Sequence, residues 1–183
     1  MQVFILGAQK IKGWHIPEDS SLLSERLVSG MGFLDWNINS LKEKGINPKS
    51  ISLISGHKFK EIQKLNPDIN YIVNPNWKET HVTGSIRHAL NYWSEDDLLI
   101  FYADTLFKPN ILKEFISFTS ENLIGTSKLS AIKDNANQKE INLETLNISN
   151  KYYSKFTFKK SQTSKHFSGL TFLKKESVLL FKT

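Results

Sequence analysis

The residue best placed to do chemistry is Asp104, which follows the most apolar segment of the chain. Residues 98–102 (LLIFY) are apolar without polar alternation, as in a strand buried on both faces of a parallel sheet. Pro109 then opens a helical segment at a position that proline favours. Because ligands bind at the carboxyl ends of strands in open α/β sheets, a carboxylate at this point could hold a metal ion against a phosphate. The alternative is that Asp104 only ends the strand as a polar turn residue.

A second candidate is the polar segment 7–21, which follows the first apolar run at 3–6. It contains Gly7, Gly13 and Pro17 and reads as a long loop. Loops of this length inside a compact domain are often functional. We therefore expect this loop to have a functional role.

The elements that must position these residues alternate along the chain. Strands are expected at 3–6, 51–56, 69–73 and 97–102, and helices at 33–44, 58–65, 85–93 and 109–119. This alternation predicts a doubly wound α/β domain with a mostly parallel sheet. After residue 127 the β-prone segments 128–132, 152–158 and 169–172 are separated by Asn- and Lys-rich turns, which predicts antiparallel strands at the C-terminal end.

Composition limits the class of protein. The 183 residues suit one domain covering 1–183, and the apolar helical segment that is cut off near residue 181 suggests truncation at the C-terminus. The absence of cysteine excludes disulfides and thiolate metal sites. No apolar run approaches the roughly 18 residues of a membrane span, and there is no signal peptide, so we expect a cytoplasmic protein with no membrane partner. The lysines behind the net charge of +6 are scattered, which argues against nucleic acid as a partner.

Several short segments, taken in their order along the chain, resemble the nucleotidyltransferases that make activated sugars and alcohols, such as the phosphocholine cytidylyltransferases. These segments are 3–8 (VFILGA), 32–36 (GFLDW), 41–46 (LKEKGI), 51–57 (ISLISGH), 74–80 (NPNWKET), 84–85 (GS) and 103–107 (ADTLF). The resemblance implies a Rossmann-like fold of the GT-A nucleotidyltransferase type. It also implies a nucleoside triphosphate and a phosphorylated small molecule, such as a sugar phosphate or phosphocholine, as the binding partners.

The resemblance also implies roles for individual residues. Asp104 corresponds to the family's Asp that binds Mg²⁺. Lys10 and Lys12 could supply, as catalytic residues, the cations that offset the triphosphate charge. The nucleotide-binding residues that it implies are Leu6, Gly7, Ala8, Gln9, Gly56, Asn74, Thr83, Gly84 and Ser85.

The sequence departs from the family's pattern in the loop that should hold the phosphates. The family has Gly-x-Gly-x-Arg followed by Pro-Lys, whereas residues 7–13 read GAQKIKG and the Pro-Lys position falls near Asp19. His81 replaces an Asn, and the family's second metal-binding Asp would lie past Thr183. These departures favour a second hypothesis, a catalytically degenerate nucleotide-binding or regulatory domain of the same fold.

A third hypothesis is a glycosyltransferase that uses a nucleotide sugar. Such enzymes usually carry Asp-x-Asp at the strand end, whereas Asp104 is followed by Thr105 and Leu106. We therefore place this hypothesis lower. The sequence does not identify the base, the acceptor or the oligomeric state.

Overall fold

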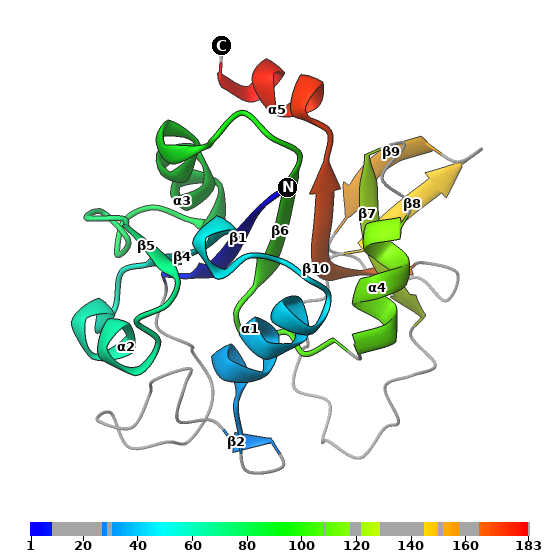
Figure 1. Ribbon diagram of the computed structural model, residues 1–183. Coiled ribbons are helices and arrows are strands. Elements are labelled where there is room, and N and C mark those ends of the chain that lie inside the picture. Colours follow the sequence, from blue (N-terminus) through cyan, green and yellow to red (C-terminus); the bar gives the residue numbers. More distant parts are fainter. Residues whose placement is uncertain are drawn as a thin grey trace, which may run out of the picture. The chain divides into compact units, whose positions relative to one another are not determined.

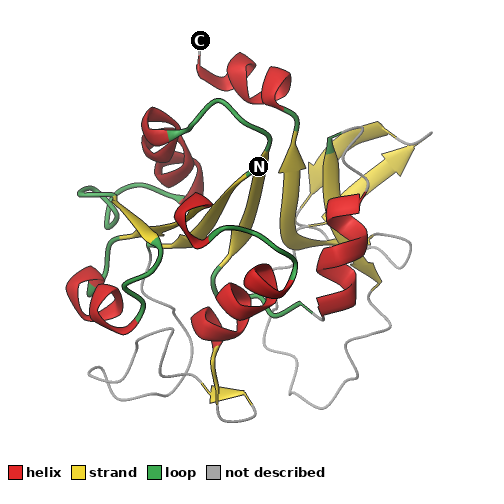
Figure 2. Cartoon of the chain, in the orientation of Figure 1, coloured by secondary structure: helices red, strands yellow, loops and turns green. Residues whose placement is uncertain are grey.

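The chain forms two compact units in a computed structural model that describes residues 1–8, 27–28, 31–107, 109–117, 122–128, 145–149, 152–157 and 165–182. One unit consists of Met1–Leu123 and Thr171–Thr183, and the other of Ile124–Leu170. Figure 1 labels their helices and strands, and Figure 2 colours them by type. The predicted single domain over 1–183 and its truncation stay predictions.

The first unit alternates strands and helices, as the sequence predicts. Its strands are β1 (Gln2–Gly7), β2 (Leu27–Val28), β3 (Met31–Gly32), β4 (Ile51–Ser55), β5 (Asn70–Val73) and β6 (Leu98–Tyr102). Its helices are α1 (Phe33–Glu43), α2 (Phe59–Leu65), α3 (Val82–Ala89), α4 (Pro109–Ser117) and α5 (Lys175–Lys182), with short 3-10 helices at Pro48–Ser50 and Leu90–Tyr92.

The central strands of the first unit are parallel, which confirms the prediction. Their order is β5-β4-β1-β6, so β1, dark blue in Figure 1, lies between β4 and β6. Ile5 of β1 stands opposite Leu53 of β4 and Phe101 of β6, and all three side chains are buried. Burial of both faces explains why these strands are apolar at successive positions rather than at alternate ones.

Helices cover both faces of this sheet, so the predicted doubly wound arrangement is confirmed. Phe4, Ile54 and Ile100 share one face and pack into a cluster with residues of α3 and α5. On the other face, the Tyr71 hydroxyl lies 2.8 Å from the Asn66 carbonyl oxygen and 3.3 Å from that of Ile62 in α2. Burial, together with the nearby Asp35, raises the pKa of Tyr71 to about 12.

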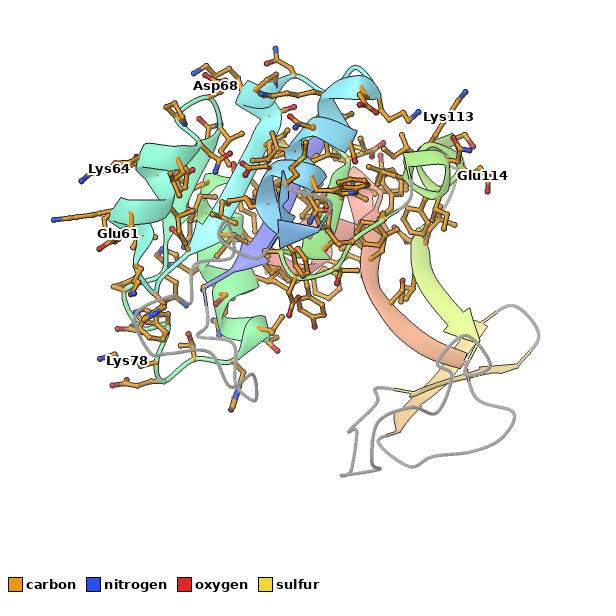
Figure 3. The ribbon with its side chains drawn as sticks, turned by 90° about the horizontal axis from the view of Figure 1, so that it is seen from below. Glu61, Lys64, Asp68, Lys78, Lys113 and Glu114 are labelled. Carbon is orange, nitrogen blue, oxygen red and sulfur yellow. The ribbon has the colours of Figure 1, made fainter. Side chains whose placement is uncertain are left out.

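The helices turn their charged side chains outward. Figure 3 shows Glu61 and Lys64 of α2 pointing away from the sheet, whereas Ile62 between them is buried. Lys113 and Glu114 of α4 point outward in the same way. In the described part of the chain, no helix is long and apolar enough to cross a membrane.

The second unit contains the antiparallel strands predicted for the C-terminal end. Its strands are β7 (Leu123–Lys128), β8 (Thr145–Ser149), β9 (Tyr152–Thr157) and the first part of β10 (Lys165–Leu173), with β7 and β10 continuing into the first unit. β8 pairs antiparallel with both β9 and β10. The expected strand at 128–132 begins earlier, at Leu123, and residues 129–132 lie outside the described residues.

The helix predicted at 85–93 was wrong at both ends. α3 begins at Val82 and ends at Ala89, after which the chain tightens into a 3-10 helix. Val82, Ile86, Ala89 and Leu90 continue one helical face. Gly84 does not interrupt this face, because it lies in the first turn of α3, where Thr80 packs against it.

The C-terminal helix α5 is fixed to the first unit through polar contacts. Asp97 accepts a hydrogen bond from the Lys175 backbone N–H at 2.9 Å and an ion-paired one from Lys174 Nζ at 2.8 Å. Asn122 accepts a hydrogen bond from the Lys174 backbone N–H at 2.8 Å and donates to the Ser177 hydroxyl. Burial opposes the ionisation of Asp97, but the Lys174 and Lys175 hydrogen bonds outweigh it and lower its pKa.

We expect Asp97→Ala to lower the free energy of unfolding by about 1–2 kcal/mol at neutral pH, because it removes the cap of α5 and an ion pair. The pKa of Asp97 is lower in the folded protein than in the unfolded chain. The stabilisation is therefore present above the unfolded pKa of about 4 and is lost as the pH falls through the folded value. Urea unfolding at a series of pH values measures the difference.

Asp68→Ala is the matched control for this prediction. Asp68 is 73% exposed and lies 3.6 Å from Lys42, an exposed pair worth about 0.5 kcal/mol or less. Equal losses for the two variants, or a loss for Asp97→Ala that does not change down to pH 2, would contradict the assignment of a cap to Asp97.

Candidate functional site

The carboxyl ends of four parallel strands bring several predicted residues to one edge of the sheet. Gly7 stands opposite Ser55, and Ser55 stands opposite Val73. Leu6 stands opposite Tyr102. The residues that come after these paired strand ends therefore lie along the same edge of the sheet. They are Ala8, Gly56, Asn74 and Asp104.

The end of β1 is held by backbone hydrogen bonds on both sides. The Leu6 carbonyl accepts from the Ala103 N–H at 3.0 Å, and the Ala8 carbonyl accepts from the His57 N–H at 3.0 Å. Gly7 and Ala8 are buried. The three other residues predicted to follow them in the loop, Gln9, Lys10 and Lys12, lie outside the described residues.

Asn74 organises the turn that follows β5. Its side-chain nitrogen donates to the Thr80 hydroxyl at 2.8 Å and to the Ser85 hydroxyl at 3.0 Å, and its oxygen accepts from the Asn76 N–H at 3.0 Å. Asn74 is 2% exposed and Ser85 is 3% exposed. Both side chains therefore shape the site from beneath its surface, by fixing the turn to the start of α3.

Thr83, Gly84 and Ser85 lie in the first turn of α3, which begins before the helix start predicted at residue 85. Thr83 is exposed. A Cβ on Gly84 would come within 2.7 Å of the Thr80 Cβ, so only glycine lets the turn pack this closely. Backbone N–H groups in a first helical turn lack helical partners and favour anions. Contact between these residues and a nucleotide stays a prediction.

The end of β4 carries an aromatic pair that the sequence analysis did not single out. A Cβ on Gly56 would lie 2.4 Å from Trp77 Cγ, so the indole rests directly on the Gly56 backbone. The His57 and Trp77 ring centroids are 5.3 Å apart, and Lys78 Nζ lies 5.6 Å from the Trp77 ring. Because the His57 N–H also donates to the Ala8 carbonyl, this aromatic pair lies next to the end of β1.

Asp104 is exposed in the turn that follows β6. The Thr105 N–H donates to the Tyr102 carbonyl at 3.1 Å and closes this turn. No group of three or more His, Cys, Asp or Glu side chains that could hold a metal occurs among the described residues. Mg²⁺ keeps several waters and needs only one or two carboxylates plus phosphate oxygens, so Asp104 suits a site that substrate phosphates complete.

Two side chains of α1 hold the segment that carries Asp104. Asn37 Nδ2 donates to the Ala103 and Thr105 carbonyls, and Trp36 Nε1 donates to the Phe107 carbonyl at 3.3 Å. The sequence pointed to Trp36 only as part of the segment 32–36, and Asn37 was missed. The signal for Asn37 was its position on the apolar face formed by Leu34, Ile38 and Leu41, where a polar residue needs a hydrogen-bond partner.

Comparison by sequence identifies no relatives, because no protein-family profile matches the chain and no curated protein sequence does so either.

Comparison by structure gives many matches, among them the following three. The inositol-1-phosphate CTP transferase of T. maritima has a TM-score of 0.72 at 17% identity, over 98% of this chain and 73% of that one. A Bacillus anthracis protein assigned as a glucose-1-phosphate thymidylyltransferase, in complex with a sucrose, has a TM-score of 0.72 at 13% identity, over 97% and 73%. LicC, the CTP:phosphocholine cytidylyltransferase of Streptococcus pneumoniae, has a TM-score of 0.66 at 14% identity, over 98% and 75%.

The fold is that of the sugar-phosphate nucleotidyltransferases. The resemblance expected from the short sequence segments is therefore confirmed at the level of structure. At this level of sequence identity, a shared nucleotidyltransferase fold does not identify the substrate. The roles predicted for individual residues remain predictions.

We expect Asn74→Ala to lower the free energy of unfolding by about 2–3 kcal/mol. The Ser85 hydroxyl, the Thr80 hydroxyl and the Asn76 N–H would all lose their hydrogen bond to the Asn74 side chain. Chemical denaturation measures the loss. Asn76→Ala is the matched control, since the structure uses the Asn76 backbone and leaves its side chain exposed. A loss for Asn76→Ala as large as that for Asn74→Ala would show that the Asn74 amide does not organise the turn.

Proposed function

We propose that this chain binds a nucleoside triphosphate with Mg²⁺ and transfers its nucleotidyl group to a phosphorylated small molecule. The observation that carries the proposal is the exposed carboxylate of Asp104 at the carboxyl end of β6, in a nucleotidyltransferase fold. The bound nucleotide would lie along the edge formed by the ends of β1, β4 and β6. A cytoplasmic location is part of the same proposal.

The proposed reaction is an in-line displacement at phosphorus. A phosphate oxygen of the acceptor forms a bond to the α-phosphorus, the bond from that phosphorus to the bridging oxygen breaks, and pyrophosphate leaves with the electron pair. Mg²⁺, when bound, neutralises the charge on the phosphate oxygens. The protein needs to position the two phosphates and offset their charge, because little covalent chemistry is required of it.

In this proposal, different residues bind the metal, offset the phosphate charge and contact the nucleotide. Asp104 holds the metal, and Lys10 and Lys12 offset the triphosphate charge. The backbone of Leu6, Gly7, Ala8 and Gln9 contacts the nucleotide, together with Gly56, Thr83 and Gly84. Asn74 and Ser85 support this set from below, because both are buried and bonded to each other.

The acceptor belongs to the proposal as a chemical class only. The similar structures are named for inositol 1-phosphate, glucose 1-phosphate and phosphocholine, each a phosphate ester of a small alcohol or sugar. We propose the same class for this chain and make no choice within it.

A second candidate function is nucleotide binding without transfer. The departures in residues 7–13 favour it, because this segment has no arginine and its second glycine is out of register with the family's loop. Lysine offers a point charge where arginine would offer a planar fork of donors. Pyrophosphate release separates the two functions, since binding without release would select the degenerate domain.

We expect calorimetric titration with CTP, UTP, GTP and ATP to show selective binding that depends on Mg²⁺. Asp104→Asn should weaken Mg²⁺-dependent binding about tenfold or more, because it removes the negative charge of the metal ligand. Binding measured without Mg²⁺ should stay the same or become tighter, since that carboxylate no longer repels the phosphates.

Asp68→Asn is the matched control, because it makes the same chemical change at an exposed position in the loop before β5. It should leave binding unchanged. If the folded wild type binds none of the four nucleotides, the proposed function is wrong. Equal effects of Asp104→Asn and Asp68→Asn would remove Asp104 from the metal site.

A further inference from the structure

In the segment between β6 and α4, the backbone carbonyls of Ala103 and Thr105 lie outside any helix or strand. Asn37 Nδ2 lies 3.4 Å from the Ala103 carbonyl oxygen and 3.0 Å from that of Thr105. A side-chain amide nitrogen carries two hydrogens, so both can be used. Because both neighbours are acceptors, the nitrogen of the amide must face them and its oxygen must face away.

These bonds fix the backbone on each side of Asp104. The peptide group between residues 103 and 104 is held through the Ala103 carbonyl by Asn37. The peptide group between residues 104 and 105 is held by the hydrogen bond from the Thr105 N–H to the Tyr102 carbonyl. The direction of the Asp104 side chain from the backbone is thereby set, while its carboxylate stays exposed.

Burying the Asn37 amide costs free energy unless its polar atoms find hydrogen-bond partners. It is 3% exposed and shares its helix face with the buried Leu34, Ile38 and Leu41. An apolar side chain at this position would continue that face, whereas a buried amide must find partners for its polar atoms. The described partners of the Asn37 nitrogen are the carbonyls on either side of Asp104.

Trp36 supports the far end of the same segment. Its indole N–H donates to the Phe107 carbonyl at 3.3 Å. The Phe107 ring meets Phe101 of β6 edge to face, with centroids 5.5 Å apart. Two adjacent residues of α1 therefore hold residues 103–107 against the end of β6.

We propose that Asn37 is a positioning residue for the metal-binding carboxylate of Asp104, with Trp36 as a second support. The part of this inference that concerns the metal rests on the proposed function. Asn37 acts through the Asp104 backbone and touches neither nucleotide nor metal. A fixed carboxylate loses less freedom when it binds Mg²⁺, so the metal should bind at lower concentration.

The test uses three variants of the full chain. Asn37→Leu keeps the number and branching of the side-chain heavy atoms and removes both donors. Trp36→Phe removes only the indole donor and keeps an aromatic ring, so it serves if Asn37→Leu does not fold. Asn39→Leu is the matched control, because it makes the same change at an exposed position of the same helix.

The first measurement is amide hydrogen exchange followed by NMR, which does not depend on any ligand. Asn37→Leu should speed exchange of the Thr105 amide by about tenfold, because the turn closed by the Thr105 N–H loses the hydrogen bonds from Asn37. Trp36→Phe should act in the same direction and less strongly. Amides in β4 should be unaffected, as should the Thr105 amide in Asn39→Leu.

The second measurement is the Mg²⁺ concentration at half-saturation for binding of CTP, UTP, GTP or ATP, each at fixed concentration. Asn37→Leu should raise this concentration by about threefold to tenfold through the loss of preorganisation. Nucleotide binding without Mg²⁺ should not change. A residue with only a structural role would weaken both kinds of binding together or neither.

The outcomes separate this inference from the proposed function. Unchanged Thr105 exchange in a folded Asn37→Leu, or a Mg²⁺ shift no larger than that of Asn39→Leu, would overturn the positioning role while nucleotide binding by the wild type stood. If the wild type binds no nucleotide, the metal role fails with the proposed function, and faster Thr105 exchange would still establish that Asn37 holds the turn.

Discussion

The parallel register of β1 between β4 and β6 is the constraint on which the site depends. Gly7 stands opposite Ser55 and Leu6 stands opposite Tyr102, so three strands end at nearly the same level. A shift of one residue in either pairing would exchange the two faces of the strand and move Ala8 away from the turn of Asp104. The apolar side chains on both faces oppose such a shift, because most of those in β1, β4 and β6 are buried.

Two buried asparagines fix the turns at this edge of the sheet. Asn74 holds the turn after β5 to the start of α3, and Asn37 holds the turn after β6 to α1. In each case the amide nitrogen serves two acceptors, which a hydroxyl side chain with a single hydrogen could not do. The irregular backbone at the edge is thus fixed by the side chains beneath it, and exposed groups such as Asp104 and Thr83 remain available for a ligand.

Much of the fold could be predicted from sequence because its signals are local. The apolar runs at 3–6, 51–56 and 97–102 mark buried strands, and the position of Asp104 follows from the end of such a run. The hydrogen bonds of Asn37 could not be predicted in this way, since they join residues more than sixty positions apart. The helix start predicted at residue 85 was wrong, because α3 already includes Gly84, which fits a close contact with Thr80.

The contacts of Asn122 join the point where the chain leaves the first unit to the point where it returns. Asn122 stands where the chain leaves the first unit, and it bonds Lys174 and Ser177 just after the chain has returned. The exit and the return are therefore neighbours, as at the base of an inserted domain. The chain therefore leaves and re-enters the first unit at one place, and the parallel pairs of β1 with β4 and β6 lie wholly within that unit.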